Sequence, residues 1–286
     1  MGHRATLIEA VPQQGSVNWT FCATDGASRY SIRLNRTRSV ADAFKEYERE
    51  RWCIEMARTC GVLTPRVMRV GHGDESAWMI QEWIDGVQAT ETAKSFRTLG
   101  AYARQLSEAR VSPDVALFPD SQKHWTAQVT YNLEQLRDDD PLISLGVYRT
   151  IDQTFLHGVF AELLTRDCVV ALDHGDLSPR NVLVRGDGAF VLIDWGCATF
   201  EVSPWVALSR MRAQHVLHGT PPVECGEAFA DGMGLSRAHA VAMQPTVHAW
   251  ALLKAIDLVR WAIDRCPERI LETADAARRV MDAVRP

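Results

Sequence analysis

The sequence predicts an α+β protein with two lobes, a small antiparallel-sheet lobe with one helix and a larger α-rich lobe. Two observations lead to this prediction. Short strand-like segments dominate the beginning of the chain, whereas helical spacing dominates the rest and is interrupted by one short pair of strands. The pattern changes near residue 84, so we expect an N-terminal lobe of residues 1–83 and a C-terminal lobe of residues 84–286.

The first lobe is expected to be a meander of strands with one inserted helix. Its strand-like segments are short and separated by turn-rich loops: residues 7–11, 19–24, 29–35, 64–71 and 76–84. Residues 40–60 instead have helical spacing, and Gly61 is a typical stop signal after them.

The second lobe is expected to be mostly helical. Helical spacing covers most of its length, in residues 92–109, 121–138, 147–166 and two long patterns from about 236 to the end. Residues 182–193 interrupt this pattern, and the polar residues around that interruption carry most of the functional information.

Composition and charge narrow the classes of partner. The chain has 286 residues, 47% hydrophobic and 23% charged, which is ordinary for a globular protein. The net charge is −5 and basic residues are scattered, so we expect no nucleic-acid partner. The N-terminus has no apolar signal region, and no segment approaches the roughly 20 apolar residues of a membrane span. We therefore expect a cytoplasmic protein with no membrane partner and no obligate protein partner.

A predicted β-hairpin brings two oxygen donors together. Within residues 182–193, two short apolar runs flank an Asp187-Gly188 pair, which is a strong hairpin signal. If this pair forms a two-residue turn, Asn181 faces Asp194 with Cα atoms about 4.5 to 5.5 Å apart. An amide oxygen beside a carboxylate suits Mg²⁺, which takes few protein ligands and completes its shell with water and phosphate oxygens.

A third oxygen donor, Asp176, lies on the loop HGDLSPRN, five residues before Asn181. Its carboxylate can reach the same open end of the hairpin and accept a proton there. HGDLSPRN followed by IDWG resembles the catalytic loop and metal-binding motif of the protein-kinase-like fold, in its aminoglycoside phosphotransferase and choline kinase branch. The resemblance implies that Asp176 is the catalytic base and that His174 braces the loop. It also implies that Asn181 and Asp194 bind Mg²⁺.

The resemblance extends to the residues expected to hold ATP or GTP. Arg33, in RYSIRLN, stands where the fold usually has a phosphate-binding Lys, and a guanidinium can clamp phosphate oxygens through two hydrogen bonds. Its partner should be a Glu on the following helix. Glu50 fits this position best, and Glu46, one turn earlier on the same face, remains an alternative.

Two further segments match the nucleotide site in position. MIQEWIDG resembles the hinge between the lobes, where backbone groups of Glu82 and Ile84 would hydrogen-bond the base. The loop PQQGSVNW would cover the phosphates with its backbone amides and the side chain of Ser16 or Asn18.

The acceptor site is expected on a late helix, within HAWALLKAIDLVRWAIDR. Four side chains there share a helical spacing: Trp250, Asp257, Trp261 and Asp264. Carboxylates and indoles in one stripe would suit an amino sugar or another cationic amphiphile. The alternative is that this stripe is a half-buried surface face of the helix.

Together these features predict an ATP-dependent O-phosphotransferase that transfers the γ-phosphate to a hydroxyl of a small molecule. By resemblance, an antibiotic such as an aminoglycoside ranks ahead of a metabolite such as choline, homoserine or a sugar. A nucleotide-binding pseudokinase with a regulatory role is the alternative, motivated by Arg33 and by Ala207, which lies where the family often has Asp. A protein kinase is disfavoured because the chain lacks G-x-G-x-x-G and A-P-E motifs.

Overall fold

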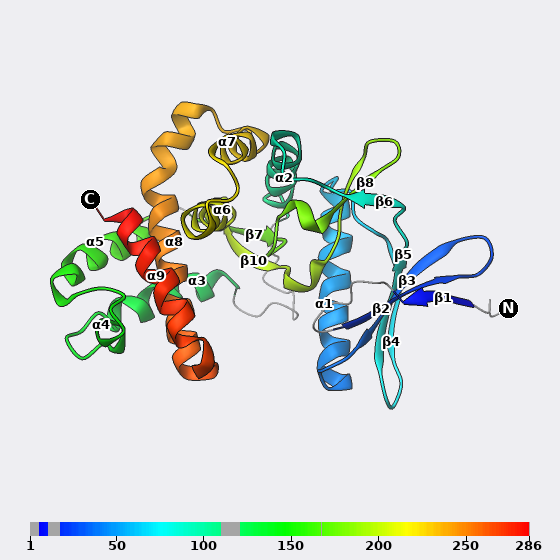
Figure 1. Ribbon diagram of the computed structural model, residues 1–286, viewed down its shortest axis with the longest axis horizontal. Coiled ribbons are helices and arrows are strands. Elements are labelled where there is room, and N and C mark those ends of the chain that lie inside the picture. Colours follow the sequence, from blue (N-terminus) through cyan, green and yellow to red (C-terminus); the bar gives the residue numbers. More distant parts are fainter. Residues whose placement is uncertain (1–5, 11–17, 110–120, 167, 286) are drawn as a thin grey trace. The chain divides into compact units, whose positions relative to one another are not determined.

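The computed structural model describes residues 6–10, 18–109, 121–166 and 168–285. Contacts divide the chain into two compact units, and most of their elements are labelled in Figure 1. The first unit contains Met1–Thr90 and His174–Thr199, and the second contains Glu91–Asp173 and Phe200–Pro286. The expected lobe boundary between residues 83 and 84 stays a prediction, and the units differ from it mainly because residues 174–199 belong to the first.

A five-stranded antiparallel sheet forms the base of the first unit, in the order β1-β2-β3-β5-β4. Its strands are β1 (Thr6–Ala10), β2 (Asn18–Thr24), β3 (Arg29–Asn35), β4 (Val67–His72) and β5 (Ala77–Glu82). Arg33 lies in the central strand, between Thr20 of β2 and Met79 of β5. The predicted α+β fold, with an antiparallel sheet and a helical majority, is confirmed.

One long helix, α1 (Val40–Thr59), packs on this sheet. The hydroxyl of Ser39 caps its first turn by accepting a hydrogen bond from the Asp42 N–H at 3.1 Å. The helix shares a small core with β5, made of Ala43, Tyr47, Ala77 and Met79. This packing fixes which face of α1 points toward the central strands.

A second, three-stranded sheet in the order β6-β8-β9 completes the first unit. It consists of β6 (Gly86–Gln88), β8 (Val182–Arg185) and β9 (Phe190–Leu192). A backbone hydrogen bond attaches it to the rest of the unit, because the Leu192 N–H donates to the Leu63 carbonyl at 2.8 Å. The hairpin is therefore part of the unit that carries the large sheet.

The hairpin exists as predicted, but its predicted register is wrong by one residue. Val182 pairs with Leu192, and the Ile193 N–H donates to the Asn181 carbonyl at 2.8 Å, so Asn181 faces Ile193 and not Asp194. The cause is the turn. Gly188, at φ +82°, closes a loop of three residues between 185 and 189, and such a loop adds one residue to the two-residue turn assumed from Asp-Gly.

The second unit is mostly helical. Its helices are α2 (Ala93–Leu106), α3 (Ser121–Glu134), α4 (Pro141–Ser144), α5 (Gln153–Leu164), α6 (Trp205–His218), α7 (Val223–Gly232), α8 (Arg237–Arg265) and α9 (Ile270–Val284). Its one sheet among the described residues pairs β7 (Val169–Asp173) with β10 (Thr199–Ser203).

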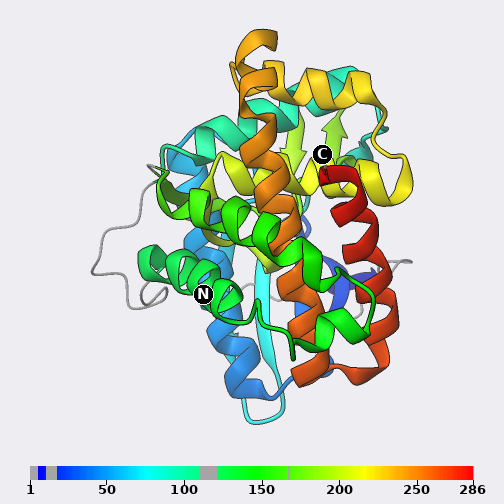
Figure 2. The ribbon, with the colours of Figure 1, turned by 90° about the vertical axis from the view of Figure 1, so that its left-hand side faces the viewer.

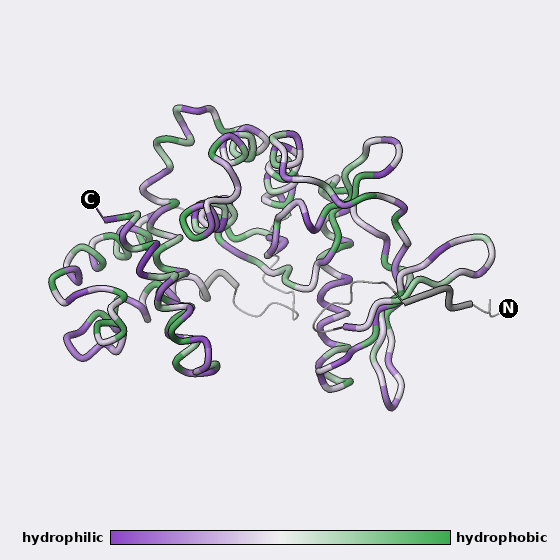
Figure 3. The backbone as a smooth tube through the Cα atoms, in the orientation of Figure 1, coloured by the Kyte–Doolittle hydropathy of each residue, from purple (hydrophilic) through white to green (hydrophobic). Residues whose placement is uncertain are grey.

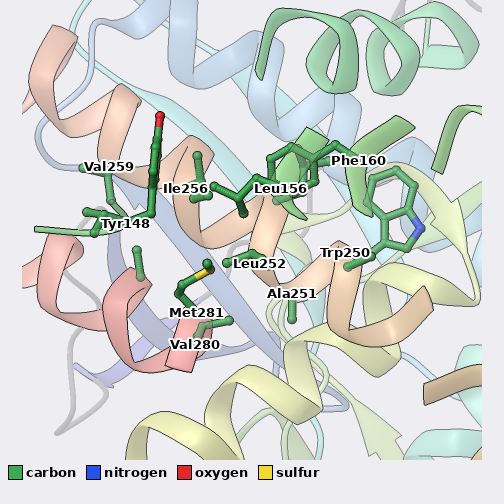
Figure 4. Close-up of a cluster of buried hydrophobic side chains, with 14 of the residues drawn as sticks. Tyr148, Leu156, Phe160, Trp250, Ala251, Leu252, Ile256, Val259, Val280 and Met281 are labelled. Atoms are coloured by element: carbon green, nitrogen blue, oxygen red, sulfur yellow. The ribbon is translucent and has the colours of Figure 1, made fainter. Parts of the chain in front are cut away.

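The middle of α8 forms the centre of this unit's core. α9 runs alongside α8 (Figure 2), and polar and apolar residues alternate along both helices (Figure 3). The alternation lets each helix bury one face. Figure 4 shows side chains from α5, α8 and α9 meeting in this core, among them Leu156, Phe160, Trp250, Ile256 and Met281. No helix in the described part of the chain is long and apolar enough to cross a membrane. The cytoplasmic location stays a prediction.

Candidate active site

His174 joins the two halves of the motif within the first unit. Its Nδ1 accepts a hydrogen bond from the Asp176 N–H at 3.3 Å, and its Nε2 lies 3.0 Å from the Ile193 carbonyl oxygen. These contacts fit a neutral ring with the proton on Nε2. The buried ring also meets Trp195 edge-on, with centroids 4.7 Å apart. His174 therefore holds the loop of Asp176 against the segment that leads to Asp194.

Gly175 allows the two motif segments to approach each other. Its φ is +84°, and a Cβ at this position would lie 2.1 Å from the carbonyl oxygen of Cys197. Both the backbone conformation and the space therefore demand glycine. The HGD and DWGC segments fit together only because this position has no side chain.

Asn181 is oriented by the loop itself. It ends a short 3₁₀ turn (Pro179–Asn181), and its side-chain Nδ2 donates to the backbone carbonyl of Asp176 at 2.9 Å. Because the amide nitrogen is used in this contact, the amide oxygen is the atom left to act as a ligand. Gln88 of β6 adds a second restraint, since its Nε2 donates to the Arg180 carbonyl at 2.8 Å.

Asp194 comes directly after the hairpin, where the chain turns sharply. Its backbone is left-handed, with φ 61° and ψ 65°. A Cβ built on Gly196 would lie 3.8 Å from Asp194 Oδ1 and 3.9 Å from both Arg33 Nη2 and Glu50 Oε2. Three charged groups from three separate segments thus surround one point.

The ion pair between Arg33 and Glu50 joins β3 to α1. The pair is enclosed, with side chains 13% and 5% exposed respectively. Burial raises the pKa of the Glu50 carboxyl, and the neighbouring Arg33 guanidinium opposes that shift. Glu46, the alternative partner, pairs with Arg38 instead. The geometry therefore selects Glu50 as the partner of Arg33, while the phosphate-binding role of the pair stays a prediction.

The remaining nucleotide-site candidates are placed as follows. Ser16 lies outside the described residues, whereas the side-chain oxygen of Asn18 accepts a hydrogen bond from the Tyr47 hydroxyl at 2.9 Å. Glu82 is the last residue of β5, and its N–H donates to the Arg66 carbonyl at 2.9 Å. Ile84 follows, in the segment between β5 and β6. The base-binding roles of Glu82 and Ile84 stay predictions.

The four candidate acceptor residues lie on α8 in the second unit, and they do not form one exposed stripe. Trp250 is 0% exposed and meets Trp125 edge-on in the core, so a substrate-binding role does not fit its burial. Asp257 is partly buried, and its carboxylate accepts hydrogen bonds from Gln128 at 2.6 Å and Asn132 at 3.1 Å. Trp261 and Asp264 are exposed, and their substrate-binding roles, like that of Asp257, stay predictions.

The four candidate residues differ in exposure because of the length and packing of α8. The helix has 29 residues, and its middle passes through the core before its C-terminal end reaches the surface. Helical spacing identifies residues on one face, but different stretches of that face meet different surroundings.

Two arrangements of charge were not anticipated from the sequence. In the first unit, Arg180 Nη2 lies 2.6 Å from Asp176 Oδ2, across four residues of the HGDLSPRN loop. The signal for it was the Arg within the motif itself. In the second unit, Arg210 pairs with Asp173, and Lys254 Nζ lies 3.1 Å from Glu201 Oε1. These acidic residues on β7 and β10 are therefore already matched by cations of the same unit.

Comparisons with known proteins identify the fold and the family. Among solved structures, an aminoglycoside phosphotransferase, APH(4)-Ia, in ternary complex with AMP-PNP and hygromycin B, is similar at 17% identity and TM-score 0.61, over 98% of this chain and 93% of that one. The choline kinase LicA from Streptococcus pneumoniae is similar at 13% identity and TM-score 0.59, over 97% of this chain and 93% of that one. These likenesses establish the fold. No curated protein matches the chain at a significant level.

A sequence profile gives the family. The profile of the phosphotransferase enzyme family matches residues 10–202, which is well over half of the chain and includes every candidate site residue of the first unit. The chain therefore belongs to the phosphotransferase enzyme family, whose members act on hydroxyl groups.

Proposed function

We propose that this phosphotransferase transfers the γ-phosphate of ATP or GTP to a hydroxyl of a small molecule, with Asp176 as the catalytic base. The observation that carries the proposal is the convergence of the Asp176 loop, Asn181, Asp194 and the Arg33–Glu50 pair within one compact unit. Phosphoryl transfer needs positioned groups and neutralised charge more than it needs covalent chemistry from the protein.

The donor set fits Mg²⁺. Asn181 offers an amide oxygen and Asp194 a carboxylate, and both are hard donors. The hydrogen bond from Asn181 Nδ2 to the Asp176 carbonyl orients the Asn181 amide for this role. No cluster of three or more His, Cys, Asp or Glu side chains suited to a metal occurs among the described residues, so a site here would draw its other ligands from water and phosphate. When bound, Mg²⁺ supplies positive charge beside the phosphates.

The chain's own residues have distinct tasks in this proposal. Asp176 orients the acceptor hydroxyl and accepts its proton as the bond to phosphorus forms. Arg33 neutralises phosphate charge, and Glu50 holds the guanidinium in place. His174 takes no part in proton transfer, because its ring nitrogens are used to hold the loop.

Two classes of acceptor molecule are compatible with this proposal. An antibiotic such as an aminoglycoside is the first, since the resemblance of the catalytic motif favours it and the fold is shared with an enzyme complexed with hygromycin B. A metabolite such as choline, homoserine or a sugar is the second.

The test is nucleoside diphosphate release with Mg²⁺ and ATP or GTP, over a panel of aminoglycosides, other hydroxylated antibiotics and small metabolites. We expect acceptor-dependent turnover that falls about 10²- to 10⁴-fold in Asp176→Asn. Asp187→Asn is the matched control, because this exposed carboxylate lies in the hairpin turn and pairs with Arg185. Nucleotide binding without turnover on any acceptor would instead favour a regulatory pseudokinase.

A further inference from the structure

Arg180 is a cation that the roles described so far do not use. Its side chain is 69% exposed and pairs at 2.6 Å with Asp176, the candidate base, which is 33% exposed. An ion pair with this much solvent around it stabilises a fold very little. The contact can therefore be exchanged for another anion without loss of the folded structure.

The backbone beneath this side chain is firmly held. Pro179 starts the 3₁₀ turn, the Asn181 N–H donates to the Ser178 carbonyl at 3.0 Å, and Gln88 binds the Arg180 carbonyl at 2.8 Å. A long flexible side chain is thus presented from a fixed point. Only the guanidinium needs to move when its partner changes.

Arg180 also adjoins a candidate metal ligand. It directly precedes Asn181 in the 3₁₀ turn Pro179–Asn181. In an in-line transfer, the γ-phosphate must lie between the metal and the acceptor hydroxyl. Asn181 marks the first of these positions and Asp176 the second, and Arg180 adjoins Asn181 in the chain and pairs with Asp176.

The second arginine of the site has a different environment. Arg33 is 13% exposed and is held by the buried carboxylate of Glu50. It is fixed on the central strand, whereas Arg180 is exposed on the loop that carries the base. Two cations on separate segments can neutralise different phosphates.

We propose that Arg180 binds the γ-phosphate and is a catalytic residue of the transfer. It leaves Asp176 when the triphosphate binds, and it contacts the oxygens of the phosphoryl group as this group moves. This exchange also frees Asp176 Oδ2 to receive the acceptor proton. The inference rests on the proposed function and assigns it a further residue.

The transfer breaks one bond to phosphorus and forms another. The bond from γ-phosphorus to the bridging oxygen breaks, and its electron pair stays with the departing diphosphate. The acceptor oxygen forms the new bond to phosphorus, and its proton passes to Asp176. Arg180 stays protonated throughout and contributes charge and hydrogen bonds only.

The test compares binding of a triphosphate analogue and a diphosphate. Displacement of a fluorescent ADP analogue from the full-length protein, with Mg²⁺ present, gives the affinities of AMP-PNP and of ADP. We expect Arg180→Gln to weaken AMP-PNP binding about 10- to 100-fold, because a charged hydrogen-bond partner is lost, and to leave ADP binding within about twofold. Arg185→Gln is the matched control, since Arg185 is exposed and pairs with Asp187 in the hairpin turn.

A second variant makes the assignment sharper. Asp176→Asn removes the anion that competes for Arg180, so it should tighten AMP-PNP binding several-fold without affecting ADP. The double variant should lose this gain. If Arg180→Gln weakens both nucleotides equally or neither of them, the proposal is overturned and Arg180 only positions the loop.

Failure of the proposed function would give a different combination of binding and turnover results. If AMP-PNP discrimination depends on Arg180 while no acceptor supports turnover, Arg180 binds the γ-phosphate but the transferase proposal fails. If acceptor-dependent turnover is observed and discrimination does not depend on Arg180, the transferase stands and the Arg180 assignment fails. A wild-type protein that binds neither nucleotide would overturn both.

Discussion

The HGDLSPRN and IDWG segments of the first unit and helix α8 of the second were both expected to carry site residues. The two regions differ in how their expected residues are held and buried. In the first unit, His174, Gly175 and Asn181 are fixed by backbone hydrogen bonds and close approach. On α8, Trp250 is enclosed in the core, and the family profile ends at residue 202, before this helix begins. A motif of ordered polar residues specifies a backbone shape, whereas helical spacing specifies only a shared face.

The largest loss of stability and activity is expected on substitution of Gly175, because a side chain there would disrupt the backbone conformation directly. Gly175→Ala places a Cβ in a left-handed backbone 2.1 Å from the Cys197 carbonyl oxygen. We expect a loss of about 3 to 5 kcal/mol in the free energy of unfolding and loss of activity. Urea unfolding and diphosphate release measure the two effects.

Gly188→Ala is the control for this prediction. Gly188 has a similar positive φ of +82°, but a Cβ there would meet no atom within 4 Å. Only the conformational cost of about 1 to 2 kcal/mol should remain. Equal costs for the two substitutions would show that the contact between the HGD and DWGC segments is unimportant, and the contrast with α8 would lose its basis.

The second largest loss of stability is expected on removal of the buried ion pair between Arg33 and Glu50. Glu50→Gln leaves the Arg33 guanidinium without its anionic partner, and we expect this change to cost about 3 kcal/mol of stability and to weaken nucleotide binding. Glu46→Gln is matched in chemistry and lies one turn earlier, where its carboxylate pairs with the partly exposed Arg38. It should cost under about 1 kcal/mol and leave nucleotide affinity unchanged. The reverse result would assign the role to Glu46.

Much of the first unit could be predicted because local signals agree there. The helix expected over residues 40–60 occupies Val40–Thr59, since Ser39 caps its start and Gly61 follows its end. The hairpin was also evident from Asp187-Gly188. Its register was not, because Asp-Gly suits both a two-residue turn and a three-residue loop closed by a glycine in the left-handed region.

Other features depend on tertiary contacts that no local pattern encodes. Trp250 shares its helical face with Trp261, and the sequence does not say that Trp125 and the α5 side chains cover one and not the other. The pairing of Arg180 with Asp176 also escaped prediction, because it spans a loop and a 3₁₀ turn, where the pairing rules of α-helices do not apply.

The smallest loss of stability is expected for a substitution on α8. This substitution distinguishes a core residue from a residue of the acceptor site. Trp250→Phe keeps an aromatic ring but loses part of its packing, and the Trp250 Nε1 has no hydrogen-bond partner among the described residues that the change could remove. We therefore expect a loss of only about 1 to 2 kcal/mol in the free energy of unfolding, with the KM for the acceptor unchanged. Trp261→Phe, at a 43% exposed position, should change stability by less than about 0.5 kcal/mol. If Trp250→Phe raises the acceptor KM and leaves stability intact, then Trp250 contacts the acceptor after all, and the stripe predicted from spacing would be as informative as the motif.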